Sequence, residues 1–178
     1  MQEHAYALIN VDMHVMATVP SPFTYCSAAA LRMAARRVSQ FYDGYLAPEG
    51  LKVSQYSVLS IAARRREKPP TVNELAEELG MDRSTLGHNL RPLERDGLIT
   101  LESDVQDKRV RRVVVTELGR AKRRACRELW ALAQARFEEA FGSARAAELG
   151  GLLAFIARDL DLRVLPSTRS DESPPHVR

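Results

Sequence analysis

The sequence has 178 residues, a length that suits a single domain with an apolar core of its own. Its 26 lysines and arginines barely outnumber its 23 acidic residues, and the net charge is only +3. This balance excludes a protein that coats nucleic acid through overall positive charge. Any contact with nucleic acid must come from local basic patches.

Cysteine and histidine usage argues against a metal site. Cys26 and Cys126 are too few for a disulfide framework or a cysteine-built zinc site, and the four histidines lack metal-ligand spacing. We therefore expect no metal and no cofactor. No apolar run approaches the roughly 20 residues of a membrane helix, and the N-terminus lacks a signal-peptide pattern. The sequence predicts a cytoplasmic protein without a membrane partner.

Two helices are expected in the N-terminal third of the chain. Residues 1–22 show no pattern that assigns them an element and are treated as an N-terminal extension. Apolar residues recur at helical spacing over residues 23–46, which predicts a long helix. A second helix is expected over Val53–Ala63, closed by a run of arginines and Pro69-Pro70.

The most informative segment runs from Asn73 to Gly119. A short amphipathic helix ends at Gly80, which can adopt the left-handed backbone of a helix end. A second helix follows, with Asp82 or Ser84 as its cap. This order is typical of a helix-turn-helix whose second helix enters a major groove. The buried stripe of the second helix is expected to be Leu86, Leu90 and Leu93.

A basic hairpin follows the second helix. Ile99–Glu102 and Arg111–Val115 favour strands, and a polar turn over residues 103–108 separates them. A charge run is usually a solvated face, but beside a candidate recognition helix it favours phosphate contact. We therefore predict a mainly α protein with a winged helix-turn-helix DNA-binding head over residues 66–116. The positive charges of its wing are Lys108, Arg109, Arg111 and Arg112.

Two further helices are expected after the hairpin. Thr116 can cap a helix that runs to about Phe141, and a last helix is expected over residues 144–162. The tail, residues 163–178, is rich in proline, serine and charge and is expected to be disordered. The apolar stripes of the helices outside the head, in 23–65 and 117–162, are most economically buried by self-association. Completion of a monomeric core is the alternative.

The motif resembles the MarR family of winged-helix transcriptional regulators. Asp107-Lys108-Arg109, followed by Thr116-Glu117-Leu118-Gly119, is similar to the family's wing signature, and Leu93–Ile99 is similar to its exit from the recognition helix. The resemblance covers about residues 26–160. It implies an obligate homodimer with long N- and C-terminal dimerisation helices. It also implies binding to a palindromic operator, usually as a repressor that a small ligand or an oxidant releases.

The candidate DNA contacts follow from the chemistry of each side chain. Amide and hydroxyl side chains suit base edges, whereas serine and the cationic side chains suit phosphates. Asp107 is expected to orient Arg109 rather than to touch DNA. Gly87 stands where the family commonly has a larger residue, and Pro92 is expected to bend the helix. The base-edge candidates are Thr85, His88 and Asn89, and the phosphate candidates are Ser84, Arg91, Lys108, Arg109 and Arg111.

Two routes of release from DNA are considered. The resemblance implies a pocket between the dimerisation helices and the head, filled by a small aromatic acid. The candidate lining is Tyr42, Tyr45, Tyr56 and Arg64. The alternative is peroxide or thiol sensing through Cys26, because an N-terminal helix position and nearby arginines lower the pKa of a thiol.

Other functional classes receive less support. The sequence has no glycine-rich phosphate loop, nucleophile elbow or paired metal ligands, so we do not expect an enzyme. The main alternative is a winged-helix adaptor that binds protein without specific DNA binding. Ionic strength separates the two, because DNA binding weakens steeply with salt and an apolar protein contact does not.

Overall fold

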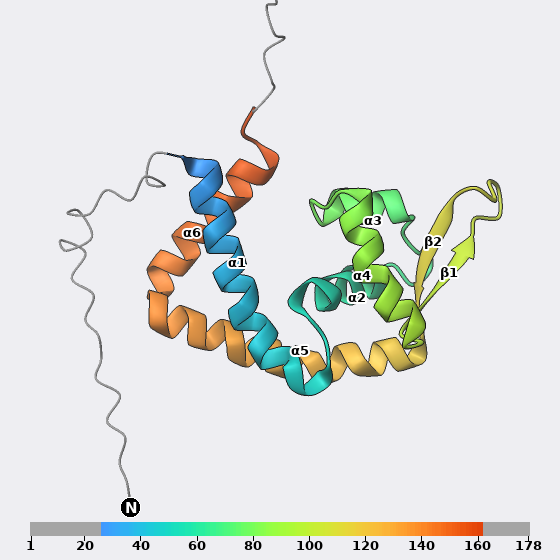
Figure 1. Ribbon diagram of the computed structural model, residues 1–178, viewed down its shortest axis with the longest axis horizontal. Helices are drawn as coiled ribbons and strands as arrows, with labels where there is room; N and C mark the ends of the chain where they lie inside the picture. The colour runs from blue at the N-terminus through green and yellow to red at the C-terminus, as the bar shows by residue number, and fades with distance from the viewer. Residues whose placement is uncertain (1–25, 162–178) are drawn as a thin grey trace, which may run out of the picture. The chain divides into compact units, whose positions relative to one another are not determined.

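The computed structural model describes residues 26–161, so the extension predicted for residues 1–22 and the tail predicted for 163–178 lie outside the described residues (Figure 1). The described part is mainly helical and holds one antiparallel two-stranded sheet. The chain divides into two compact units, Met1–Gln134 and Ala135–Arg178, and each is described by itself. Within residues 26–161 no single helix is long and apolar enough to cross a membrane; only the bent pair of helices Glu117–Phe141 and Ser143–Arg158, taken together, has the required length and composition.

The first unit begins with two helices joined by a tight turn. Helix α1 spans Ser27–Leu46, the 3₁₀ turn η2 spans Ala47–Glu49, and α2 spans Val53–Arg64. Gly50 follows η2 with φ of +68°, a conformation that glycine adopts without strain. The carboxylate of Asp43 then accepts a 2.7 Å hydrogen bond from the first amide of α2. The two helices expected in this region are confirmed within a few residues.

The helix-turn-helix consists of α3 (Val72–Glu78) and α4 (Arg83–Arg95). Thr71 and Glu74 form a reciprocal capping box at the start of α3, with hydrogen bonds of 2.8 and 3.1 Å. Of the two caps considered for α4, Asp82 is the one observed, because its Oδ1 accepts from the Thr85 amide at 2.8 Å. Hydrogen bonds from the Thr85 side chain and amide lower the pKa of Asp82. The helix contains Pro92 and continues through it to Arg95.

The core of the first unit is built around one face of α4. The predicted stripe, Leu86, Leu90 and Leu93, is buried, and α4 packs on α2, α3 and the first strand. Full burial of each leucine contributes about 1.5–3 kcal/mol. Further side chains with almost no exposed surface come from α1, α2, α3, the hairpin and the helix after it, among them Leu46, Val58, Leu59, Leu75, Ile99, Val113 and Cys126.

The hairpin has the expected strands. Strand β1 (Ile99–Ser103) pairs antiparallel with β2 (Arg111–Val115), with Ile99 opposite Val115 and Ser103 opposite Arg111. Arg112 lies half-buried where β2 meets the loop before α3. Its guanidinium pairs with Asp104 and donates a 2.7 Å hydrogen bond to the Pro69 carbonyl. Arg112 therefore fastens the wing to the head, although the sequence groups it with the DNA-facing charges.

Helix α5 spans Glu117–Phe141 and begins in the first unit. Its predicted cap is confirmed, because Thr116 Oγ1 accepts from the Gly119 amide at 3.0 Å and donates to the Gly97 carbonyl at 2.7 Å. In the second unit the rings of Phe137 and Phe141 stack, with centroids 5.5 Å apart.

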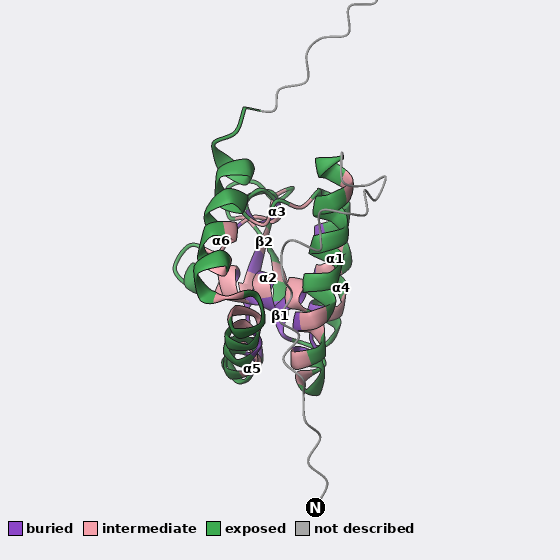
Figure 2. Ribbon diagram, turned by 90° about the vertical axis from the view of Figure 1, so that its left-hand side faces the viewer, coloured by how far each residue is buried: buried purple, intermediate pink, exposed green. Residues whose placement is uncertain are grey.

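Helix α6 of the second unit spans Ser143–Arg158, so the last predicted helix is confirmed but ends four residues earlier than expected. None of its residues is buried. In the first unit, α1 buries only Tyr42 and Leu46. Both helices accordingly appear exposed along most of their length (Figure 2). Each carries apolar side chains that remain exposed among the residues that the structure describes.

Substitution of Gly119 by alanine should destabilise the fold. A Cβ at this position would lie 2.0 Å from the Leu98 carbonyl oxygen and 2.9 Å from a Val115 methyl group, so the start of α5 must move away from the hairpin. We expect a loss of at least about 1–3 kcal/mol in the free energy of unfolding, measured by denaturant titration. Gly44→Ala is the matched control, because a Cβ there meets nothing within 4 Å. Equal stability of the two variants would contradict the contact.

The pairing of Arg112 with Asp104 should make stability depend on pH. The Arg112 hydrogen bond, followed by the amides of Gln106 and Asp107, lowers the pKa of Asp104. A lowered folded-state pKa means that the ionised carboxylate stabilises the fold above its unfolded pKa of about 3.9, and that this stability is lost as pH falls through the folded value. Asp104→Asn should therefore be less stable than wild type at pH 7, with the difference shrinking below about pH 4.

Urea titrations of both proteins across this pH range measure the effect. Glu128→Gln, at an exposed position on α5, is the control for the loss of one carboxylate outside the hairpin. A difference between wild type and Asp104→Asn that stays constant down to pH 3 would argue against an ionic role for Asp104.

Candidate DNA interface

The outward face of α4 carries most of the polar side chains predicted to contact DNA. Ser84, Thr85, His88 and Arg91 are exposed, whereas Asn89 is half-buried. Asp82 fixes the N-terminal end of this face, and the leucine stripe holds the opposite face in the core. The sequence prediction of which side of α4 faces solvent is therefore confirmed.

Two of the three base-edge candidates already use their polar groups inside the protein. The Asn89 amide accepts a 2.7 Å hydrogen bond from the Ser54 hydroxyl of α2 and donates a 2.9 Å bond to the Thr85 carbonyl. The Thr85 hydroxyl donates to Asp82 at 2.6 Å. Asn89 must release both bonds before it pairs with an adenine. Base reading by these residues stays a prediction.

The wing presents its tip to solvent. Lys108 and Arg109 are exposed in the turn between β1 and β2. Asp107 accepts a 2.9 Å hydrogen bond from the backbone amide of Arg109, so it shapes the turn that carries the arginine. Arg111 is exposed but donates a 2.6 Å hydrogen bond to the Leu101 carbonyl across the hairpin. Arg109 and Lys108 are thus the wing cations with the greatest freedom to meet a phosphate.

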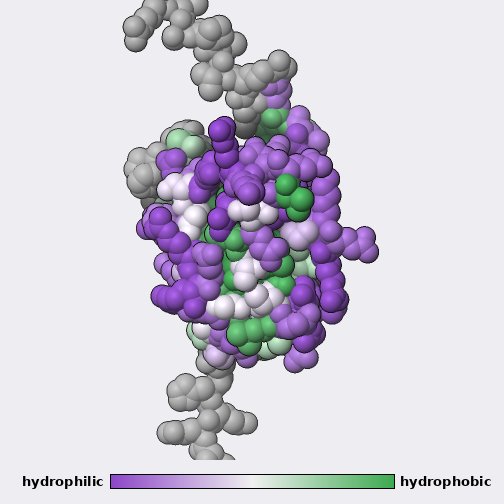
Figure 3. Space-filling model, turned by 90° about the vertical axis from the view of Figure 1, so that its right-hand side faces the viewer, coloured by the Kyte–Doolittle hydropathy of each residue, from purple (hydrophilic) through white to green (hydrophobic). Residues whose placement is uncertain are grey.

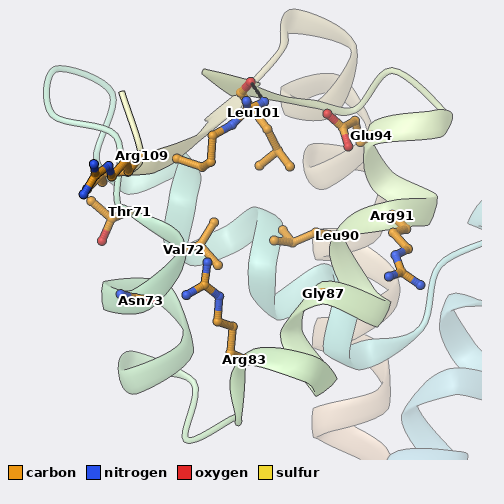
Figure 4. Close-up of a pocket in the computed structure, with 12 residues that line it drawn as sticks. Thr71, Val72, Asn73, Arg83, Gly87, Leu90, Arg91, Glu94, Leu101 and Arg109 are labelled. Atoms are coloured by element: carbon orange, nitrogen blue, oxygen red, sulfur yellow. Dashed lines mark hydrogen bonds between the residues drawn. The ribbon is translucent and has the colours of Figure 1, made fainter. Parts of the chain in front are cut away.

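A pocket of about 400 Å³ lies between α4, the start of α3 and the wing (Figure 4). We call it the head groove. Seen from the wing side, the surface is largely hydrophilic around a smaller apolar area (Figure 3). The lining has one acidic residue, Glu94, and apolar contributions from Val72, Leu90 and Leu101. Its cationic side chains are Arg83, Arg91, Arg109 and Arg111.

Sequence reasoning missed Arg83. It is the first residue of α4, and Figure 4 shows its side chain extending towards Val72 of α3. Arg91 leaves α4 on the side turned away from Val72. The signal was available, because residues 83, 87 and 91 are spaced by four and share one face of a helix. The groove therefore combines a helix suited to a major groove with cations suited to phosphates.

A second pocket, of about 520 Å³, lies between α2 and α5, and we call it the α2–α5 pocket. It brings together Tyr56 and Arg64, as predicted, but its lining does not include Tyr42 or Tyr45. Tyr42 is buried and donates a hydrogen bond to Gln134, and the Tyr45 ring contacts Phe41 at 5.1 Å. The remaining lining is Ser57, Ser60, Ile61, Leu79, Arg123, Arg127 and Trp130.

The α2–α5 pocket contains polar atoms whose hydrogen-bonding capacity is unused. Ser60 Oγ and Arg123 Nε are buried without a hydrogen-bond partner among the described residues. Such groups cost free energy unless something binds them. The sequence signal for α5 lay in Arg123, Arg127 and Trp130, which recur at helical spacing on one face. The basic run of this helix therefore belongs in part to a pocket rather than to a solvated surface.

The two cysteines lie in different surroundings. Cys26 is exposed and directly precedes α1, and its side chain forms no cap hydrogen bond. Cys126 is buried in α5, where desolvation raises the pKa of its thiol. Cys126 is therefore a small core residue whose thiol stays protonated at neutral pH.

Comparison with known proteins agrees with this geometry. A sequence profile of the MarR family matches residues 49–110. The structure of the M. tuberculosis transcriptional regulator MosR in complex with DNA is similar, with 33% identity and a TM-score of 0.61 over 75% of this chain and 98% of that chain. CouR from Rhodococcus jostii RHA1, bound to p-coumaroyl-CoA, has 25% identity and a TM-score of 0.63 over 76% of this chain and 94% of that one.

A further structure, the transcriptional repressor CouR bound to a 23-mer DNA duplex, has 29% identity and a TM-score of 0.66 over 74% of this chain and 92% of that chain. No curated protein matches the sequence. The chain has a winged helix-turn-helix with the family's wing signature, and it is similar to MosR over almost all of that protein. The chain belongs to the MarR family of transcriptional regulators.

Proposed function

We propose that the protein is a homodimeric repressor that binds a palindromic operator and is released by a small aromatic acid. The observation that carries the proposal is the head groove, where the outward face of α4 and the wing arginines face one cavity. A helix of this kind enters a major groove by its N-terminal residues, and the cations beside it neutralise phosphates. The proposed set of contacts comprises Ser84, Thr85, His88, Asn89, Arg91, Lys108, Arg109 and Arg111, with Asp107 shaping the wing turn.

The proposed dimer rests on the apolar side chains that the chain leaves uncovered. On α1, Met33 keeps 56% of its surface exposed, and on α6 Leu152 keeps 55% and Phe155 keeps 49%. A monomer seldom exposes this much apolar surface on two helices, and a second copy is the simplest cover. A twofold dimer presents two copies of α4 to two half-sites that are about 34–36 Å apart or a multiple of this distance.

Repression is proposed from the relatives. CouR is described as a transcriptional repressor and has been seen bound to a 23-mer DNA duplex, and MosR has been seen in complex with DNA. A protein that occupies an operator beside a promoter blocks transcription without further machinery. The head groove supplies the DNA contact that this role requires.

The α2–α5 pocket supports the proposed effector. Tyr56 and Trp130 supply aromatic walls, and Arg123 supplies an unpartnered buried N–H for a carboxylate. CouR is similar in fold and has been seen bound to p-coumaroyl-CoA, an aromatic acyl thioester. If the effector binds the free protein more tightly than the DNA-bound protein by about 1–3 kcal/mol of binding free energy, operator affinity falls about 5–150-fold. Tyr42 and Tyr45 remain candidates only as supports for the surrounding helices.

Salt titration with Arg109→Ala tests the DNA contact. Because Arg109 is exposed at the wing tip, its loss should weaken binding similarly for all duplexes and lower the slope of log affinity against log salt by about one. Arg95→Ala is the matched control, since Arg95 is also exposed but pairs with Asp96 at 2.8 Å at the far end of α4. If wild type binds selected and random duplexes equally at physiological salt, the protein is an adaptor rather than an operator-binding regulator.

Fluorescence of Trp130, the one tryptophan of the chain, tests the effector site. Salicylate, 4-hydroxybenzoate and 4-hydroxycinnamate are added to wild type and to Arg123→Met. We expect a phenolic acid to change the fluorescence of wild type, and the variant to bind at least about tenfold more weakly, because it loses a charge-assisted hydrogen bond. The variant should be as stable as wild type, since an unpartnered buried N–H is removed.

Arg124→Met, one residue along α5 and exposed, is the control for the change in charge and should bind the acid like wild type. The same acid should release the operator from wild type. Release by peroxide instead, abolished in Cys26→Ser and matched by no aromatic acid, would replace the ligand proposal with thiol sensing.

A further inference from the structure

Two of the polar side chains on the outward face of α4 already form hydrogen bonds within the protein. Asn89 is tied to Ser54 of α2 at 2.7 Å and to its own helix at 2.9 Å, and the Thr85 hydroxyl is tied to Asp82 at 2.6 Å. Breaking such bonds costs part of what a base contact would return. Direct reading of base edges therefore falls to side chains of α4 that are not already bonded.

Arg83 satisfies this requirement. It is exposed, lines the head groove and forms no hydrogen bond or ion pair within residues 26–161. Its place as the first residue of α4 is where recognition helices meet base edges. The planar guanidinium presents paired N–H donors that match the O6 and N7 acceptors of guanine, and no other base offers two acceptors there.

Gly87 opens the space that this contact requires. It lies one turn after Arg83 on the same helix, and both residues line the head groove. A Cβ at Gly87 would meet nothing within 4 Å, so no packing within the protein explains a glycine that weakens the helix. An open helix surface between Arg83 and Arg91 lets a DNA duplex approach the backbone closely.

We propose that Arg83 is the specificity-determining residue of α4 and reads a guanine in each half-site, with Gly87 admitting the edge of the duplex. Asn89 is then a positioning residue that fastens α4 to α2 through Ser54. The inference rests on the proposed operator binding and names the base class that α4 recognises. The base contact is then made by the guanidinium of Arg83, which suits guanine, and not by the amide of Asn89, which suits adenine.

Replacement of single guanines by 7-deazaguanine tests the assignment. The full-length protein is first used to select its operator from random duplexes, and each guanine of one half-site is then replaced in turn. At one position the loss of N7 should weaken wild-type binding roughly tenfold, because a hydrogen bond to a charged donor disappears. In Arg83→Ala the same replacement should cause no further loss.

The outcomes of this test separate the inference from the proposed function. Preference for the selected operator over random duplexes decides whether the protein is an operator-binding regulator at all. If the protein prefers its operator, two results would overturn the role of Arg83. Either no 7-deazaguanine replacement weakens wild-type binding, or the same replacement weakens Arg83→Ala as much as wild type. Lys108→Ala is the control variant and should keep the sensitivity of wild type, because that residue lies at the wing tip.

Two further variants test Gly87 and Asn89. Gly87→Ala and Gly44→Ala should both raise the thermal midpoint, but only Gly87→Ala should weaken operator binding. Asn89→Ala and Ser54→Ala should weaken all operators by the same factor without changing the preferred base, and the double variant should be no weaker than either. The inference is contradicted if Gly87→Ala binds the operator as tightly as wild type. It is also contradicted if Asn89→Ala loses a preference for adenine that Ser54→Ala keeps.

Discussion

Burial of one leucine face of α4 is the constraint on which the rest of the structure depends. Leu86, Leu90 and Leu93 pack against α2, α3 and the hairpin, so rotation of the helix about its axis would expose them. Because residues three and four apart share a face, this packing also decides which side chains face outward. The same apolar contacts that stabilise the head therefore aim Arg83, Gly87 and His88 away from the core. The Asp82 cap fixes the N-terminal end of α4, and the Asn89–Ser54 hydrogen bond fastens its middle to α2.

Helix α2 connects the two proposed binding sites. Ser54, near its start, holds the recognition helix, and Tyr56, Ser60 and Arg64 further along line the α2–α5 pocket. A ligand that draws α2 towards α5 changes the position of Ser54 and, through Asn89, that of α4. This is the physical route that the proposed regulation would use, and a coupling of about 1–3 kcal/mol would be enough. Its elements all lie within the first unit of the chain.

Local patterns were enough to predict the elements of the fold. Helical periodicity placed α1, α2 and α5, the leucine spacing of α4 identified its buried face, and β-prone runs on either side of a polar turn placed the wing. Each of these patterns is formed by residues close together in the sequence, so it can be recognised without the fold. The pairings that sort one arginine from another were not predictable in this way. Arg112 is bound to Asp104 and Pro69 while Arg109 is exposed, yet both belong to one basic run.

The candidate sites show the same division. The Ser54–Asn89 bond joins residues 35 positions apart, and the α2–α5 pocket joins Tyr56 to Trp130 across most of the first unit. Only the fold brings such residues together, so the sequence could show neither the bond between Asn89 and Ser54 nor the absence of Tyr42 from the lining of this pocket.

Hydroxyl-radical footprinting of the full-length protein on its selected operator tests the central claim, that two copies of α4 read the two halves of one palindrome. The account predicts two equivalent protected segments, related by the twofold axis of the sequence and centred about 34–36 Å apart or a multiple of this distance. A single protected segment without a symmetric partner would contradict it.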